Sequence, residues 1–62
     1  MINPNEIPIE VEREVDGRYL ASAPGFPGVM AYGHSEEEAV RRARGIAVEV
    51  LADSIDEGSV NR

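Results

Sequence analysis

Residues 6–23 read EIPIEVEREVDGRYLASA, and this stretch decides the fold. Apolar side chains alternate along its first half with one exception, Arg13: Ile7, Ile9, Val11 and Val15. Acidic side chains occupy the positions between them: Glu6, Glu10, Glu12 and Glu14. A repeat of two residues is typical of a strand with one buried face and one solvated face. The sequence therefore predicts a first strand at about residues 6–15, with the long stem of Arg13 lying over the margin of the core.

The dipeptide Asp16-Gly17 is a strong hairpin signal and predicts a second strand at about residues 18–23. A two-residue loop would pair Val15 with Arg18. A three-residue loop, with Gly17 left-handed, would pair Glu14 with Arg18 and set Tyr19, Ala21 and Ala23 beside Arg13, Val11 and Ile9. We favour the second register, because it opposes unlike charges and keeps small side chains beneath a covering helix.

Residues 23–28 read APGFPG, and two prolines with two glycines exclude both a helix and a continuous strand. Pro24-Gly25 predicts a type II turn with Gly25 in the left-handed region. Phe26 is the only phenylalanine, and we expect it to close the core margin from this loop. The next residues predict a third strand at about residues 28–33, ending at Gly33.

A helix is predicted at about residues 36–57, starting after a capping box formed by Ser35 and Glu38 and stopping at Gly58. Glu38 is also placed to pair with Arg42 one turn on, as is Glu37 with Arg41. The helix would be roughly 33 Å long, whereas an eight-residue strand covers about 26 Å. We therefore expect part of the helix to overhang the sheet. The predicted fold class is α+β: a three-stranded antiparallel sheet in β-β-β-α order, covered on one face by one long C-terminal helix.

Two apolar stripes run along this helix. The first is expected to cover the sheet and comprises Ala39, Val40, Ala43, Ile46, Ala47, Val50 and Leu51. The second, on a different side, repeats through Val48, Leu51, Ala52 and Ile55 and is extended upstream by Gly45. Its residues Gly45, Val48, Ala52 and Ile55 are expected to mediate self-association. One sheet cannot cover both stripes, and a glycine inside a helix is explained if another backbone approaches there. The alternative is that a curved sheet or residues 59–62 cover the second stripe.

The chain has 62 residues, which predicts one domain over residues 1–62. A domain of this size buries only about 60% of the surface that its unfolded chain exposes. With no cysteine for a disulfide, a homo-oligomer is the expected means of stabilisation. Twelve acidic residues against six arginines give a net charge of −6, which argues against direct nucleic-acid binding and favours a basic protein partner. The alternative is that the acidity only maintains solubility. The candidate partner-binding residues are Glu10, Glu12, Glu14, Phe26, Asp53, Asp56 and Glu57.

No enzyme, cofactor or metal site is expected. His34 is the only histidine and precedes the helix cap, where we expect it to be exposed. Without cysteine, an ordinary zinc site and a Cys/His pair are excluded within one chain. The acidic residues of the first strand step along one face without converging on an ion. No apolar run approaches the roughly 20 residues that cross a bilayer, and the start lacks the features of a signal peptide, so a cytoplasmic location is expected.

The ordered set of motifs resembles the N-terminal domain of HicB-type antitoxins over about residues 7–58. The motifs are IEVERE at residues 9–14, DGRY at 16–19, PGFPGVMAYG at 24–33 and EEA at 37–39, followed by the long helix. The resemblance implies a partial, catalytically inactive ribonuclease H-like layout. It also implies a partner, HicA, a small basic ribonuclease of double-stranded-RNA-binding fold that cleaves mRNA and is inhibited by the antitoxin.

Many members of that family carry a C-terminal DNA-binding segment, whereas only residues 59–62 follow Gly58 here. We therefore expect neither DNA binding nor autoregulation. The first functional hypothesis is an antitoxin module that inhibits a small basic HicA-type mRNA ribonuclease. The alternative is an orphan oligomeric HicB-like domain with a structural or small-ligand-binding role and no toxin partner.

Overall fold

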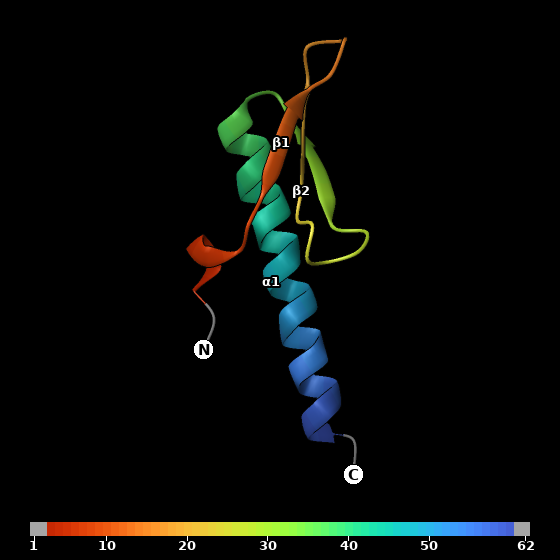
Figure 1. Cartoon of the computed structure of the whole chain (residues 1–62). Helices are drawn as coiled ribbons and strands as arrows, with labels where there is room; N and C mark the ends of the chain where they lie inside the picture. Colours follow the sequence, from red (N-terminus) through yellow and green to blue (C-terminus); the bar gives the residue numbers. More distant parts are fainter. Residues whose placement is uncertain (1–2, 61–62) are drawn as a thin grey trace.

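A computed structural model describes the backbone of residues 3–60 and the side chains of residues 3 and 5–53 (Figure 1). The elements in chain order are a 3-10 turn η1 (Pro4–Glu6), strands β1 (Glu10–Arg13), β2 (Tyr19–Ser22) and β3 (Met30–Gly33), and helix α1 (Glu36–Val60). The strands form one antiparallel sheet in the order β1-β2-β3, and α1 packs on one face of it. The predicted α+β fold class is confirmed.

The β1–β2 hairpin has the three-residue register. Arg13 pairs with Tyr19 and Val11 with Ala21. The loop is closed by the N–H of Glu14 donating to Arg18 O at 2.7 Å, and Gly17 has a φ of 94°. A left-handed residue closing a three-residue hairpin favours glycine because it carries no Cβ.

The backbones of Glu14 and Arg18 pair as predicted, but the expected pairing of their charged side chains is wrong. The Arg18 Nε lies 2.8 Å from Asp16 Oδ2, and the Arg18 N–H donates to Asp16 Oδ1 at 3.0 Å. Asp16 lies in the same turn and accepts both groups, so the guanidinium is held over the turn.

The strands are shorter than predicted, and β1 differs most. Glu6 belongs to η1, and Pro8, which has no N–H to donate to a ladder, separates that turn from the strand. Ile7 is nevertheless buried, as the alternation predicts. The prediction for Val15 is wrong: its relative exposure is 109%, because it lies in the turn beyond the end of β1.

Two consecutive turns form the loop between β2 and β3. Phe26 N–H donates to Ala23 O at 2.9 Å, and Val29 N–H donates to Phe26 O at 3.0 Å. Pro24 and Pro27 therefore occupy the same position in successive turns. The left-handed residue is Gly28, with φ 81°, and not Gly25 as predicted, because only the second turn requires a positive φ. Phe26 packs against the core, as expected.

A column of alanines forms the contact between α1 and the sheet. Ala39, Ala43 and Ala47 are completely buried, four residues apart along the helix, and Ala21 of β2 is completely buried opposite them. Alanines at this spacing let the helix axis approach the sheet closely. The approach is closest at Gly33, where an added Cβ would lie 2.5 Å from Ala39 N.

The first apolar stripe is buried only in part. Val40 and Leu51 pack against the two core clusters, whereas Ile46 and Val50 remain 38% and 40% exposed. The prediction that these two residues cover the sheet is wrong. Three short strands cover the alanine column and its nearest neighbours, so Ile46 and Val50 extend past the sheet.

The start of α1 follows the predicted cap with one change. Glu38 N–H donates to Ser35 Oγ at 3.1 Å, but the Glu38 carboxylate accepts from His34 N–H at 2.6 Å and not from Ser35. Glu38 and Arg42 form the predicted ion pair at 3.2 Å; Glu37 and Arg41, both described, form none. The predicted stop at Gly58 is wrong, because α1 continues to Val60; glycine permits a left-handed stop without forcing one.

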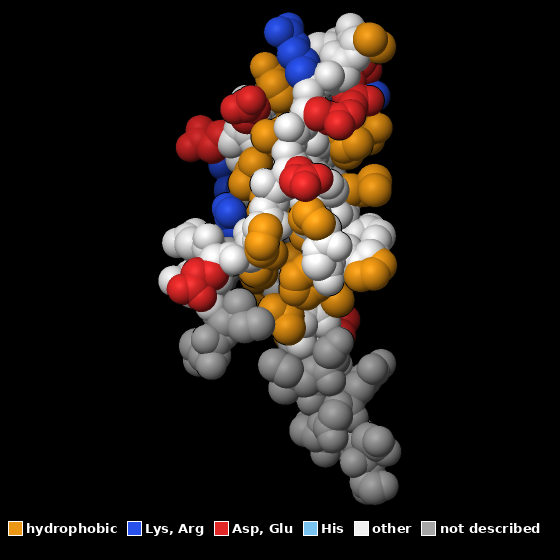
Figure 2. Space-filling view, viewed as in Figure 1, with side chains coloured by type: hydrophobic (Ala, Val, Ile, Leu, Met, Phe, Trp, Pro, Cys, Tyr) orange, Lys and Arg blue, Asp and Glu red, His pale blue; other side chains and the backbone are white. Residues whose placement is uncertain are grey.

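The C-terminal half of α1 projects beyond the sheet, as the length difference predicts (Figure 1). The described chain is accordingly elongated, with extents of 47 × 19 × 15 Å. Hydrophobic side chains reach the surface along the described length, with acidic side chains between them (Figure 2).

Candidate partner-binding face

The sheet presents one face to α1 and the other to solvent. Successive strand residues point to opposite faces, so the burial of Ala21 against α1 fixes the side to which its neighbours point. The face away from α1, which we call the open face, is formed by alternate residues of all three strands: Glu10, Glu12, Leu20, Ser22, Met30 and Tyr32. No described element covers this face.

The open face is acidic at one edge and apolar across its middle and other edge. The register places Glu12, Leu20 and Tyr32 in one row. Glu10, Ser22 and Met30 form the second row. A hollow of about 420 Å³ is lined by the residues of β1 and β2: Glu10, Val11, Glu12, Leu20 and Ser22. Met30 is 54% and Tyr32 42% exposed, which is unusual for large apolar side chains that lie next to each other.

Arg18 fixes the hairpin end of this face. Its guanidinium carbon lies 4.2 Å from the centre of the Tyr32 ring, a cation–π contact. Its other side meets Asp16, and the backbone N–H of Arg18 is the main reason that the pKa of Asp16 lies below its ordinary value. The Arg18 charge therefore lies at the rim and not among the acidic residues of β1.

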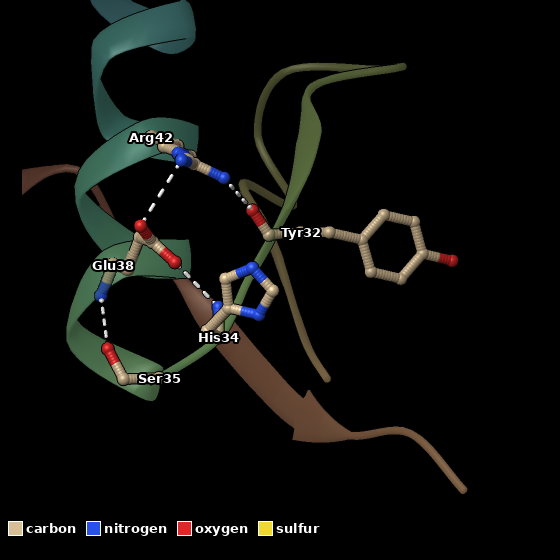
Figure 3. A network of polar contacts seen from close by, with 5 residues as sticks. All are labelled: Tyr32, His34, Ser35, Glu38 and Arg42. Carbon is tan, nitrogen blue, oxygen red and sulfur yellow. Dashed lines mark hydrogen bonds and ion pairs between the residues drawn. The ribbon is translucent and has the colours of Figure 1, made fainter. Parts of the chain in front are cut away.

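A second network joins β3 to the start of α1 (Figure 3). Arg42 donates from one nitrogen to Tyr32 O at 3.0 Å and from the other to Glu38 Oε2 at 3.2 Å. The hydrogen bond from His34 N–H, reinforced by the Arg42 charge, lowers the pKa of Glu38 below its ordinary value. His34 itself is exposed, as predicted.

This network holds β3 in place without using any side chain of the open face. Figure 3 shows the Tyr32 ring pointing away from α1 while its carbonyl faces Arg42. The same contact covers an outward carbonyl of β3, an edge strand. The result is a rigid support for Tyr32 on the opposite side of the sheet.

The structure brings together only two of the predicted partner-binding residues. Glu10 and Glu12 lie on the open face. Glu14 follows the same alternation but is half-buried beside the turn. Phe26 is half-buried and packs against the core, away from the open face, and Asp53 is exposed on α1, on the other layer. The side chains of Asp56 and Glu57 lie outside the described residues.

The predicted self-association stripe lies on the surface of α1. Gly45, Val48 and Ala52 are exposed, and the side chain of Ile55 lies outside the described residues. These residues are on the opposite layer from the open face. The molecule therefore has two separate uncovered surfaces.

Sequence reasoning missed four residues of the open face: Leu20, Ser22, Met30 and Tyr32. A signal was available, because the favoured hairpin register, with Ala21 beneath the helix, already turns its two neighbours to the other face. The sequence did not predict the register between β2 and β3. This register aligns Ala31 with Ala21 and so places Met30 beside Ser22 and Tyr32 beside Leu20.

Within residues 3–53, no group of three His, Asp or Glu side chains is placed to hold a metal ion. No helix in the described part is long and apolar enough to cross a membrane. Comparison of the chain with protein-family models, with curated proteins and with solved structures finds no match.

Proposed function

We propose that this protein is a HicB-like antitoxin module that binds a small basic HicA-type mRNA ribonuclease in the cytoplasm and inhibits it. The supporting observation is the open face, on which Glu10 and Glu12 lie at one edge and the exposed Met30 and Tyr32 at the other. The fold also agrees with the three-strand and helix layout that the sequence resemblance implies.

The chemistry of the open face suits a basic protein surface. Lysine or arginine side chains of the partner would meet the β1 carboxylates, while their stems and neighbouring apolar groups would cover Leu20 and Met30. Methionine and tyrosine are enriched at the centres of protein interfaces. The net charge of −6 would speed the encounter with a basic protein and make it sensitive to salt.

The test is co-purification of the tagged full chain from its native host, followed by a ribonuclease assay of any small basic protein recovered. We expect the chain to suppress the activity of that protein. Glu12→Lys should weaken the complex at least tenfold, whereas Glu6→Lys, an identical charge change in η1 and off the open face, should weaken it far less. Equal effects of the two substitutions would exclude the open face as the binding site.

A second candidate function is an orphan oligomeric domain with a structural or ligand-binding role. The exposed stripe on α1 favours it, because that stripe has the small and apolar composition of a self-association surface. Recovery of the chain alone, as a defined oligomer without a nuclease, would support this candidate and reject the first.

A further inference from the structure

The described residues give no reason for a glycine at position 45. It lies on the exposed side of α1, and a Cβ built on it would meet nothing within 4 Å. Glycine in a helix interior is less stable than alanine, so the folded monomer would gain from an alanine here. A glycine at such a position is explained if another backbone approaches it closely.

Two hollows meet at Gly45, each of about 560 Å³. Val40, Arg44 and Val48 line the first, on the side of α1 that faces η1. Tyr32, Ile46 and Glu49 line the second, on the side of β3. Arg41 and Gly45 line both, so the two hollows adjoin along α1 at the glycine, and we call the pair of them the depression.

We propose that a second copy of this chain occupies this depression, with its α1 crossing the first antiparallel at Gly45. The charges around the glycine carry the assignment. Arg41 lies four residues before Gly45 and Glu49 four residues after it, so each is about 6 Å along the axis from the crossing point. In a two-fold antiparallel pair the Arg41 of each copy lies level with the Glu49 of the other.

The apolar side chains fit the same arrangement. Val48 of the second copy lies level with Arg42 of the first and on the side of the first hollow, where it would contact Val40, which is two residues, about 3 Å, further along the axis. This crossing would cover Val48 and Ile46, which are 37% and 38% exposed in the single chain. Arg44, which lines this hollow, has its Nε enclosed without an acceptor among the described residues.

The full chain should sediment as a concentration-dependent dimer at equilibrium, and charge reversal at the crossing tests the pairing. Arg41→Glu and Glu49→Arg each replace both ion pairs with like-charge contacts, and each should raise the dimer dissociation constant by about tenfold. The double variant exchanges the two charges and should restore the constant to within about threefold of the wild type. Circular dichroism should be unchanged, because neither side chain contacts another described residue in an ion pair.

Gly45→Leu separates the dimer from the stability of the fold. A Cβ at this position has space in the single chain and leucine improves helix propensity, so the substitution should raise the unfolding temperature of the monomer while abolishing the dimer. A monomeric wild type at about 100 µM, or an oligomer indifferent to Gly45→Leu, would overturn the proposal. A double charge variant whose dimer dissociation constant is no lower than those of the two single variants would also overturn it. These measurements use the protein alone, and their failure would leave the proposed binding of a nuclease untouched.

Discussion

Replacing Gly33 with alanine tests the closest contact between the sheet and α1. The new Cβ would lie 2.5 Å from Ala39 N, 2.9 Å from Ala39 Cα and 3.0 Å from Glu38 C. All three atoms belong to the backbone of the first turn of α1, so no side chain can rotate to make room. The turn must move away from β3, which loosens the packing of the completely buried Ala39.

Overpacking of a core site destabilises a protein by about 1–3 kcal/mol. We expect the upper half of that range, about 2–3 kcal/mol, because the clash is with backbone. In a domain of this size about 2 kcal/mol lowers the midpoint of thermal unfolding by roughly 8–16 °C. Urea and thermal denaturation followed by circular dichroism measure both quantities.

Gly25→Ala is the matched control. Gly25 lies in the loop between β2 and β3, has no positive φ, and a Cβ there would meet nothing within 4 Å. It should leave stability unchanged or raise it by up to about 1 kcal/mol, through the reduced entropy of the unfolded chain. A Gly33→Ala protein within about 0.5 kcal/mol of wild type would refute the reasoning.

Four further substitutions probe the cap, the alanine column and the hairpin. Ser35→Ala removes the acceptor for Glu38 N–H and should destabilise the fold by about 1 kcal/mol in urea titrations; no change would mean that the cap is dispensable. Because the folded pKa of Glu38 is lowered, its contribution is present above the unfolded pKa and is lost as pH falls through the folded one; Glu38→Gln should therefore lose less stability than wild type on acidification, and parallel pH curves would contradict this. Ala43→Leu should destabilise by about 1–3 kcal/mol, whereas Val15→Thr, in the exposed turn, should stay within about 0.5 kcal/mol; equal effects would disprove the packing account.

Local patterns in the sequence were sufficient to predict the order of the strands and the helix and the register of the hairpin. Asp16-Gly17 with its flanking charges predicted the three-residue register, and Ser35 with Glu38 predicted the first residue of α1. Both signals act over at most five residues, where backbone geometry and hydrogen bonding depend only on the neighbouring residues of the chain. The sequence also predicted the length of α1 and, from the shorter length of a strand, the overhang of α1 beyond the sheet.

Local patterns failed where two segments compete or where the sheet limits what can be covered. Arg18 forms its ion pair with Asp16 instead of the expected Glu14, and the positive φ expected at Gly25 is found at Gly28. Each choice depends on which of two adjacent groups the surrounding backbone brings nearer. Ile46 and Val50 match the apolar stripe, yet the narrow sheet leaves them exposed.

The sequence by itself determined the order of elements, the fold class, the acidity and the candidate residues Glu10 and Glu12. The tertiary structure decided which surfaces remain uncovered. It removed Phe26 from the candidate partner-binding residues by packing it against the core, and it added Met30 and Tyr32 through the β2–β3 register. The physical reason is that a side chain's accessibility is set by what packs over it, and α1 packs over β1 and β2, which are distant from it in sequence.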